Sequence, residues 1–237
     1  MSLQSHSFDS LSENRLLNFL TPNDRNRLLA RMTAVSFGLK DVLYNAGGPM
    51  PYVYFPRNGV ISSVTVMADG RAAEVAATGR EGVIGLTAYY GAGQSPEKVF
   101  CQIPCDTWRL GTELFVDEVR RGGRLQALVH GYTRSVMRLV AQHAACNCLH
   151  TVEERFAKWL LMSRDRAGEE EFPLTQEFLS YMLGVRRASV TLAAGMLQKA
   201  GLIHYRHGKI RIINGKKLES AACECYQIIR EEFEYPL

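Results

Sequence analysis

The feature that most constrains this chain is an interrupted helical pattern between Leu174 and Asn214. Apolar residues recur there at helical spacing on both sides of Gly184. Two short amphipathic segments separated by a glycine turn form a helix-turn-helix. The apolar positions are Phe178, Leu179, Met182 and Leu183 in the first segment, and Val190, Leu192, Ala193, Met196 and Leu197 in the second.

The residues after the second segment predict a small β-hairpin. Gly201 ends the helix, and the run from Leu202 to Ile213 contains two alternating segments with Gly208 at the turn. A helix-turn-helix followed by a hairpin is a winged helix. We therefore predict that Leu174–Asn214 contacts DNA.

Charge is concentrated in the same part of the chain. Residues 172–215 contain six basic residues and one glutamate, a net charge of +5, whereas the whole chain carries +4. The following segment, 216–237, has three basic residues and five glutamates, a net charge of −2. A local basic segment favours a polyanionic partner, although many solvated surfaces carry as much charge.

Length and composition indicate a water-soluble protein. The 237 residues are 46% hydrophobic and 22% charged, which suffices for one large domain or two modest ones. Apolar runs stay well short of the roughly 20 residues that span a bilayer, and the N-terminus does not resemble a secretory signal. Six cysteines are too sparse for a disulfide scaffold. We expect a cytoplasmic protein with reduced thiols and no membrane partner.

The N-terminal half combines short helices with many short strands. Residues 11–31 predict helix with a restart at Thr21-Pro22, where threonine caps and proline takes the first helical position. Between Thr33 and Leu110, β-prone runs are separated by Gly, Pro, Asn and Asp, which predicts an antiparallel sandwich or barrel with a hairpin turn at Asp69-Gly70. The runs are 42–44, 52–55, 59–66, 72–77, 99–103 and 107–110.

A long helix is predicted from about Arg124 to Arg166, and a second amphipathic helix from Lys216 to about Glu232. The long helix carries residues at alternating intervals of four and three, the heptad pattern of a parallel two-stranded coiled coil. We expect these residues to form a homodimer seam, with packing on the chain's own β domain as the alternative. They are Leu125, Val129, Tyr132, Val136, Leu139, His143, Cys146 and His150.

This order of elements resembles the Crp/Fnr family of bacterial transcription regulators. The matching motif residues are Thr175, Leu179, Leu183-Gly184, Arg187 and Ser189-Val190. The resemblance implies an α+β fold with a cyclic-nucleotide-binding-like β-roll (double-stranded β-helix) at 1–122, a dimerisation helix at 123–166 and a winged helix-turn-helix at 167–237. It also implies a homodimer that binds double-stranded promoter DNA and changes recruitment of RNA polymerase.

The resemblance places the second helix in the major groove. By its position we expect Arg187 to donate two hydrogen bonds to guanine, a contact worth about 1–3 kcal/mol of discrimination. Ala188 and Leu192 replace a glutamate and an arginine of the type member, so we expect methyl contacts there and a different operator. Further contacts to phosphates are expected from Thr175, Gln176, Arg186, Ser189 and Thr191, and from His207 and Lys209 on the wing.

The predicted effector pocket departs from nucleotide-binding members of the family. Ser95-Pro96 lie where those members have an arginine-serine pair, and Leu86 lies near the position of their ribose-binding glutamate. Val140 and Ala141 occupy the adenine-contact positions and offer no side-chain hydrogen bond. Without the arginine a buried phosphate lacks its charged partner. We therefore predict that cyclic AMP is not the effector.

Cysteine and histidine patterns suggest metal chemistry only weakly. Cys146-x-Cys148 and Cys223-x-Cys225 both lie in predicted helices, where residues two apart point about 200° apart and cannot chelate one ion by themselves. His143, Cys146 and His150 share a helix face, so they either bind a metal or sense redox state across the seam, or fix its register. We favour register and predict no metal and no cofactor.

Other features carry less weight. Cys101 and Cys105 are expected to be core thiols, and the absence of earlier cysteines disfavours the iron–sulfur branch of the family. The sequence has no nucleophile elbow, phosphate-binding loop or HExxH motif, so we predict no catalytic activity. The alternative function is a ligand- or redox-sensing protein whose winged helix binds another protein.

Overall fold

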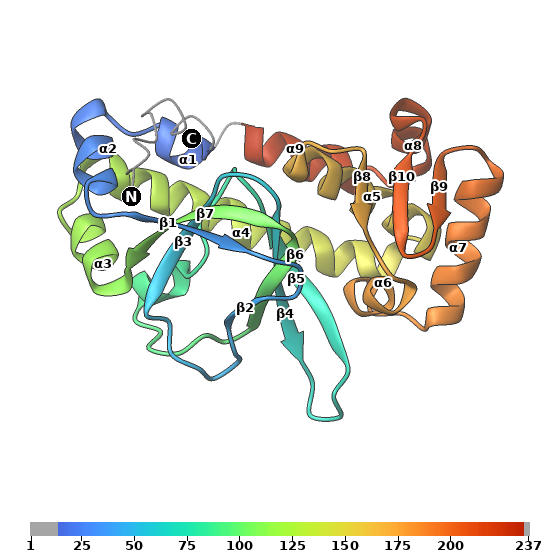
Figure 1. The fold of residues 1–237 in the computed structure, drawn as a ribbon, viewed down its shortest axis with the longest axis horizontal. Helices are drawn as coiled ribbons and strands as arrows, with labels where there is room; N and C mark the ends of the chain where they lie inside the picture. The colour runs from blue at the N-terminus through green and yellow to red at the C-terminus, as the bar shows by residue number, and fades with distance from the viewer. Residues whose placement is uncertain (1–13, 235–237) are drawn as a thin grey trace, which may run out of the picture.

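The computed structural model describes residues 14–234, arranged as a β-roll and a smaller helical domain that are linked by a long helix (Figure 1). Its helices are α1 (Arg15–Asn18), α2 (Pro22–Leu29), the 3-10 helix η2 (Leu86–Tyr90), α3 (Thr112–Arg120), α4 (Gly123–Leu149), α5 (Val152–Ala167), α6 (Gln176–Leu183), α7 (Arg187–Lys199), α8 (Gly215–Ala221) and α9 (Cys225–Glu234). Its strands are β1 (Thr33–Phe37), β2 (Val42–Tyr44), β3 (Tyr52–Pro56), β4 (Val60–Val66), β5 (Ala72–Thr78), β6 (Lys98–Ile103), β7 (Cys105–Gly111), β8 (Glu171–Pro173), β9 (Ile203–Arg206) and β10 (Lys209–Ile212). None of these helices combines the length and the apolar character needed to cross a membrane.

The β-roll consists of two antiparallel sheets, ordered β1-β7-β3 and β2-β6-β4-β5. Phe55, Val60 and Ile61 are fully buried between elements of this domain. Asp69-Gly70 lies in the turn that joins β4 to β5, and Gly70 has the positive φ of 84° that favours glycine there. The predicted sandwich and its hairpin are therefore confirmed.

Strand β1 was not among the predicted runs. Val35 and Phe37 alternate with Ser36, but the segment has only five residues and none of them is fully buried, so its sequence signal is weak. The strand is held by backbone pairing with β7, in the register Val35↔Thr107. Only the tertiary structure supplies that partner.

The N-terminal helices follow the capping pattern of the sequence. The Thr21 side chain accepts a hydrogen bond from the Asp24 amide at 3.2 Å, and Pro22 takes the first position of α2. Both features were predicted. The amides of a first helical turn have no helical acceptor, so Thr21 accepts a hydrogen bond from one of them, and Pro22 has no N–H that needs an acceptor.

The prediction of one helix from Arg124 to Arg166 is wrong, because the chain breaks into α4 and α5. His150 is extended, with φ −109° and ψ 151°, and Thr151 caps α5. The Thr151 hydroxyl accepts from the Glu154 amide at 3.3 Å, and the Glu154 carboxylate accepts from the Thr151 amide at 2.9 Å. This reciprocal capping box stabilises a new helix start.

The predicted homodimer seam stays a prediction, but most of its eight residues are buried within the single chain. Leu125, Val129, Tyr132, Leu139 and Cys146 are at most 3% exposed in a single chain. The remaining three also have partners within the chain. Val136 packs on the same core, His143 contacts the Val75 carbonyl, and His150 contacts Glu224. A helix packed on its own domain produces nearly the same spacing as a coiled coil, so the pattern could not distinguish them.

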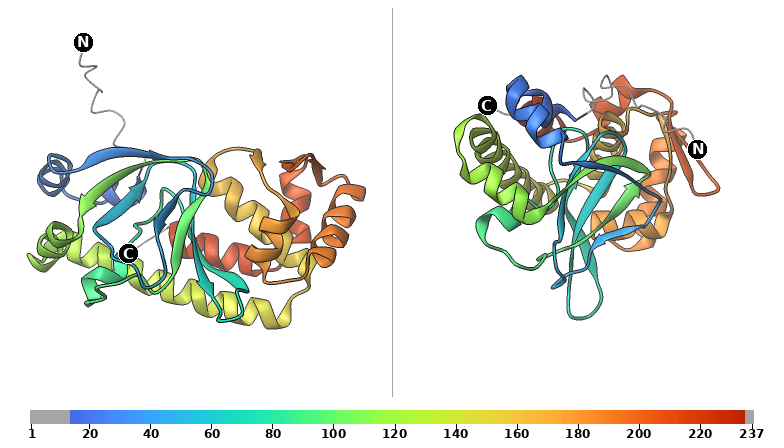
Figure 2. Two further views of the ribbon diagram at one scale, coloured as in Figure 1. Left: turned by 60° about the horizontal axis from the view of Figure 1, so that its bottom comes forward. Right: turned by 60° about the vertical axis from the view of Figure 1, so that its left-hand side comes forward.

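The C-terminal segment returns along the long helix. The single amphipathic helix predicted after Lys216 is interrupted between Ala221 and Cys225, which gives α8 and α9. Helix α9 packs beside α4, and Figure 2 shows α4 along the lower edge of the molecule with its other side uncovered. Tyr226, Ile229 and Phe233 form the buried face of α9.

A buried ion pair joins the β-roll to α5. Arg166 Nε donates to Glu81 Oε1 at 2.7 Å, and both side chains are 8% exposed. Glu81 also accepts from the Gly79 amide at 3.1 Å. Nearby, the Trp159 indole donates to Glu74 of β5 at 3.0 Å, so two polar contacts fix the same junction.

We expect Glu81→Ala to lower the free energy of unfolding by about 3–5 kcal/mol, because it leaves the Arg166 guanidinium buried without its partner. Chemical denaturation monitored by circular dichroism measures the change. Asp69→Ala, which removes the exposed ion pair to Arg71, is the matched control and should cost less than about 1 kcal/mol. Equal losses in the two variants would show that the buried pair does not hold the junction.

Candidate nucleic-acid interface

Helices α6 and α7 form the predicted helix-turn-helix. The Thr175 hydroxyl accepts from the Phe178 amide at 3.1 Å and caps α6. Gly184 ends α6 in the left-handed conformation, with φ 62°. A residue with a Cβ is strained in that conformation, which explains why glycine occupies the turn.

Helix α7 has one buried face and one exposed face. Val190, Ala193 and Leu197 are at most 5% exposed, whereas Leu192 is 69% exposed and Met196 is 51% exposed. Leu192 and Met196 therefore belong to the apolar run of the sequence but not to the buried core. Both are apolar residues on the outer face of the helix, where a major groove offers thymine methyl groups as partners.

The wing lies beside the N-terminal ends of both helices. His207 and Gly208, with φ of 51° and 71°, form the two-residue turn between β9 and β10. Both central residues of such a turn have positive φ, which matches the twist of the flanking strands. This confirms the hairpin with Gly208 at its tip.

A groove of about 370 Å³ separates the wing from the helix starts. Four of the predicted DNA-contact residues line it, namely Thr175, Gln176, Arg187 and His207. Tyr205 and Arg206 also line it, and sequence reasoning missed both. The available signal was that Arg206 directly precedes the predicted wing tip.

The other predicted contact residues lie outside this groove. Arg186 is exposed at the N-cap of α7, Ser189 is half-buried, and Lys209 is exposed opposite Arg206 in the hairpin. The Thr191 hydroxyl lies 3.1 Å from Gln176 Oε1 and joins the two helices.

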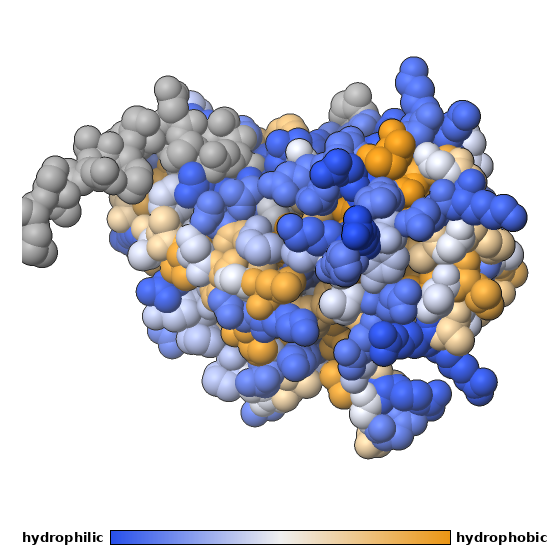
Figure 3. Space-filling view, turned by 45° about the vertical axis from the view of Figure 1, so that its right-hand side comes forward, coloured by the Kyte–Doolittle hydropathy of each residue, from blue (hydrophilic) through white to orange (hydrophobic). Residues whose placement is uncertain are grey.

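Ion pairing leaves an uneven distribution of charge on the domain. Arg211 contacts Glu171 on the neighbouring strand, with Nε 2.6 Å from Oε2, so its charge is largely offset. Arg187 and Arg206 line the groove. Arg186, which precedes Arg187 in the sequence, is exposed. Figure 3, with the C-terminal half facing the viewer, shows hydrophilic side chains over much of this face and separate apolar patches between them.

The β-roll contains a cavity of about 130 Å³ at the predicted effector position. Leu86, Ser95 and Val140 line it, so three positions singled out in the sequence do meet. Ala141, the neighbour of Val140, is exposed and does not line it. No lysine or arginine is among the described residues that line the cavity. Glu97 lines the cavity, and burial raises the pKa of its carboxyl group.

Comparison with known proteins identifies the DNA-binding half directly. A family model described as a Crp-like helix-turn-helix domain matches residues 154–221, which run from the first turn of α5 to the end of α8. No curated protein matches the chain significantly.

Solved structures share the fold of most of the chain. FixK2 from Bradyrhizobium japonicum is 19% identical with a TM-score of 0.69, covering 81% of this chain and 98% of its own. CLP, the c-di-GMP responsive global regulator of Xanthomonas campestris, is 15% identical with a TM-score of 0.66, covering 82% and 100%. A CRP-family transcriptional regulator from Thermus thermophilus is 19% identical with a TM-score of 0.65, covering 79% and 96%.

At these identities the structural likeness establishes the fold, and the domain match establishes the kind of helix-turn-helix that the fold carries. Residues 154–221 are thus similar to a Crp-like helix-turn-helix domain, and most of the chain has the fold of solved Crp/Fnr-family regulators.

Proposed function

We propose that the protein acts as a homodimer that reads a two-fold symmetric promoter site with α7 and changes the recruitment of RNA polymerase. The groove between the wing and the helix starts carries this proposal. It combines two arginines with the hydroxyl, amide and imidazole groups of Thr175, Gln176 and His207. Such side chains donate hydrogen bonds to phosphates, which position a recognition helix against base edges.

Within this interface we propose that Arg187 reads guanine and that Arg206 contacts phosphate. Arg187 is the first residue of α7, where side chains of a recognition helix reach base edges. Arg206 lies on the wing, beside the turn. Of the remaining predicted residues, we assign Thr175, Gln176, Arg186, Ser189, Thr191, His207 and Lys209 to backbone contacts.

We expect Arg187→Ala to weaken binding to the preferred operator by about 5- to 150-fold, equivalent to about 1–3 kcal/mol. The operator comes from selection of bound duplexes from a random pool, and fluorescence anisotropy measures affinity. The variant should also lose its preference at one base position in each half-site. Unchanged affinity and preference would remove Arg187 from base readout.

Two controls make the result specific. Arg206→Ala should weaken all sequences alike and lower the slope of affinity against salt by about one. Lys199→Ala changes an exposed cation at the far end of α7 and should leave binding unchanged. If the folded protein enriched no sequence at all, a protein-binding winged helix would replace this proposal.

The uncovered side of α4 supports a dimer with a different seam from the predicted one. Met137 is 68% exposed and Val140 43% exposed, and the small residues Ala144 and Cys148 follow at intervals of four. Met137, Ala144 and Cys148 lie on the side of α4 that faces away from the core, and Val140 lies at the edge between the two sides. Exposed apolar residues in a helical stripe favour a partner helix.

We expect Met137→Glu to convert the dimer to monomer, because two charges would meet in an apolar seam. Analytical ultracentrifugation over a range of concentrations measures the change. Leu39→Glu, which places the same charge at an exposed leucine of the β-roll, should stay dimeric. A dimeric Met137→Glu protein would contradict the proposed seam.

We propose further that cyclic AMP does not gate the protein. The described lining of the β-roll cavity supplies the carboxyl group of Glu97 but no cation, so a bound phosphate would lack a positively charged partner.

We also propose that the sensor domain ends near residue 122. The break at Thr151 argues that α5 belongs with the DNA-binding domain rather than with the dimerisation helix.

Isothermal titration of the folded dimer with millimolar cyclic AMP should therefore give no binding heat, and operator affinity should not change. Cyclic GMP is a parallel titrant, because it carries the same cyclic phosphate. A saturating isotherm together with a change in operator affinity would overturn this part of the proposal.

A further inference from the structure

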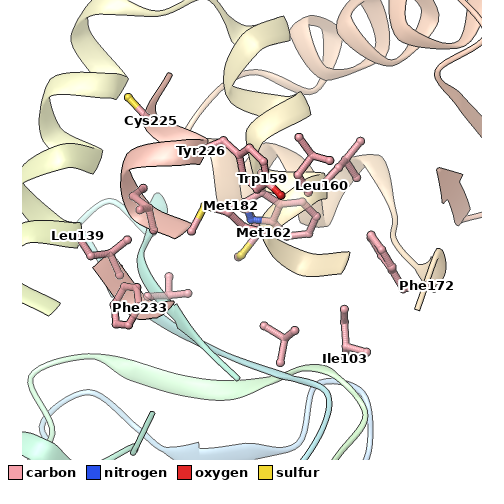
Figure 4. Close-up of a cluster of buried hydrophobic side chains, with 14 of the residues drawn as sticks. Ile103, Leu139, Trp159, Leu160, Met162, Phe172, Met182, Cys225, Tyr226 and Phe233 are labelled. Atoms are coloured by element: carbon pink, nitrogen blue, oxygen red, sulfur yellow. The ribbon is translucent and has the colours of Figure 1, made fainter. Parts of the chain in front are cut away.

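Four metal-ligating side chains converge where α4 ends and α9 begins. The sulfurs of Cys146, Cys223 and Cys225 and a ring nitrogen of His150 all lie within 4.8 Å of one another. Among residues 14–234 this is the one group of its kind that lies so close together. Figure 4 shows the Cys225 sulfur directed from α9 toward α4.

The spacing of the cysteines and histidines in the sequence did not predict this cluster. Cys146 and His150 are four residues apart and share one face of the helix end. Cys223 lies in the turn before α9, and only Cys225 is helical, so the expectation that two residues in one helix must diverge does not apply. His143, which was grouped with Cys146 in the sequence, instead contacts the Val75 carbonyl and belongs to another site.

Two of the distances between ligand atoms match those around one tetrahedral ion. Cys146 Sγ and Cys223 Sγ are 3.6 Å apart, and Cys225 Sγ is 3.7 Å from His150 Nδ1. With Zn–S bonds of about 2.3 Å and a Zn–N bond of about 2.0–2.1 Å, neighbouring ligand atoms lie about 3.5–3.8 Å apart. Ligands of a multi-iron cluster bind different irons and lie farther apart, so the spacing favours a single ion.

The surrounding groups stabilise metal-bound thiolates. Lys158 Nζ is 3.2 Å from Cys146 Sγ, and Gln142 Nε2 donates to Cys225 Sγ at 3.0 Å. His150 Nε2 lies 3.0 Å from the Glu224 carboxylate, which leaves Nδ1 free to bind the ion. A carboxylate on the second ring nitrogen is the usual support of a zinc-bound histidine. Three thiolates, one Zn²⁺ and the Lys158 ammonium together carry no net charge.

A second pair of buried thiols, Cys101 and Cys105, can be compared with the cluster at the α4–α9 junction by the number of neighbouring ligands. Cys101 and Cys105 are also 3.6 Å apart and buried, but no third or fourth ligand joins them in the described chain. They match the core thiols that the sequence predicted. At the α4–α9 junction, the additional histidine, third thiol and polar supports go beyond what a packed pair of thiols needs.

We propose that Cys146, His150, Cys223 and Cys225 bind one Zn²⁺ ion as a structural site. Cys146 and Cys225 are fully buried and Cys223 is 5% exposed, so the four protein ligands close the coordination sphere. The ion ties the end of α4 to the turn between α8 and α9. It thereby fixes the DNA-binding domain against the long helix.

The test is the metal content of untagged, full-length protein purified without chelator, measured by inductively coupled plasma mass spectrometry. We expect about one zinc per chain, and a loss of more than tenfold in Cys223→Ser and Cys225→Ser. Cys148→Ser is the matched control, because Cys148 lies two residues from Cys146 on the same helix but is exposed. It should retain the metal.

Titration of the metal-free wild-type protein with Co²⁺ does not depend on whether the variants fold. We expect a one-to-one endpoint, the absorption of a tetrahedral cobalt ion and a strong thiolate-to-cobalt band. A folded wild-type protein with neither zinc nor this spectrum would overturn the proposal. So would iron as the purified metal, a Cys146–Cys223 disulfide detected by mass spectrometry, or equal metal loss in Cys148→Ser.

Discussion

The position of the DNA-binding half relative to the β-roll depends on the ion pair of Arg166 with Glu81. Burying two charges is costly unless each finds its partner in good geometry, and a shift of either half would leave both unpaired. Glu74 of β5 accepts hydrogen bonds from Ser62 and from Trp159 of α5, so a shift of α5 relative to β5 would break a buried polar contact there as well. The junction is therefore specified by polar contacts as well as by apolar packing.

Helix α4 contacts the β-roll and α9 on one side and is uncovered on the other. The face of Leu125, Tyr132 and Leu139 packs on the β-roll and α9, as Leu139 and Phe233 illustrate in Figure 4. The opposite side presents Met137 to solvent. Val140 lies between them and lines the β-roll cavity. A ligand in that cavity would therefore contact the helix that we propose as the dimer interface.

The DNA-binding half combines predictable and unpredictable contributions. Helix caps, glycine turns and the wing follow from local chemistry, which is why Thr175, Gly184 and Gly208 were identified from sequence. The groove depends on where the wing folds back against the helix starts, and this brings in Tyr205 and Arg206. The proposed zinc site depends on a still longer return of the chain, since its ligands are up to 79 residues apart.

The sequence by itself determined the order of the β-roll, the long helix and the winged helix-turn-helix, the family resemblance and the residues at the start of the recognition helix. Those features rest on capping, turn and periodicity preferences that act over a few residues. The tertiary structure decided which face of α4 is buried, that α5 begins anew at Thr151, and that Cys146 meets Cys223. A helical repeat records that a residue is apolar but not which surface covers it. Contacts between distant segments form only when the whole chain packs.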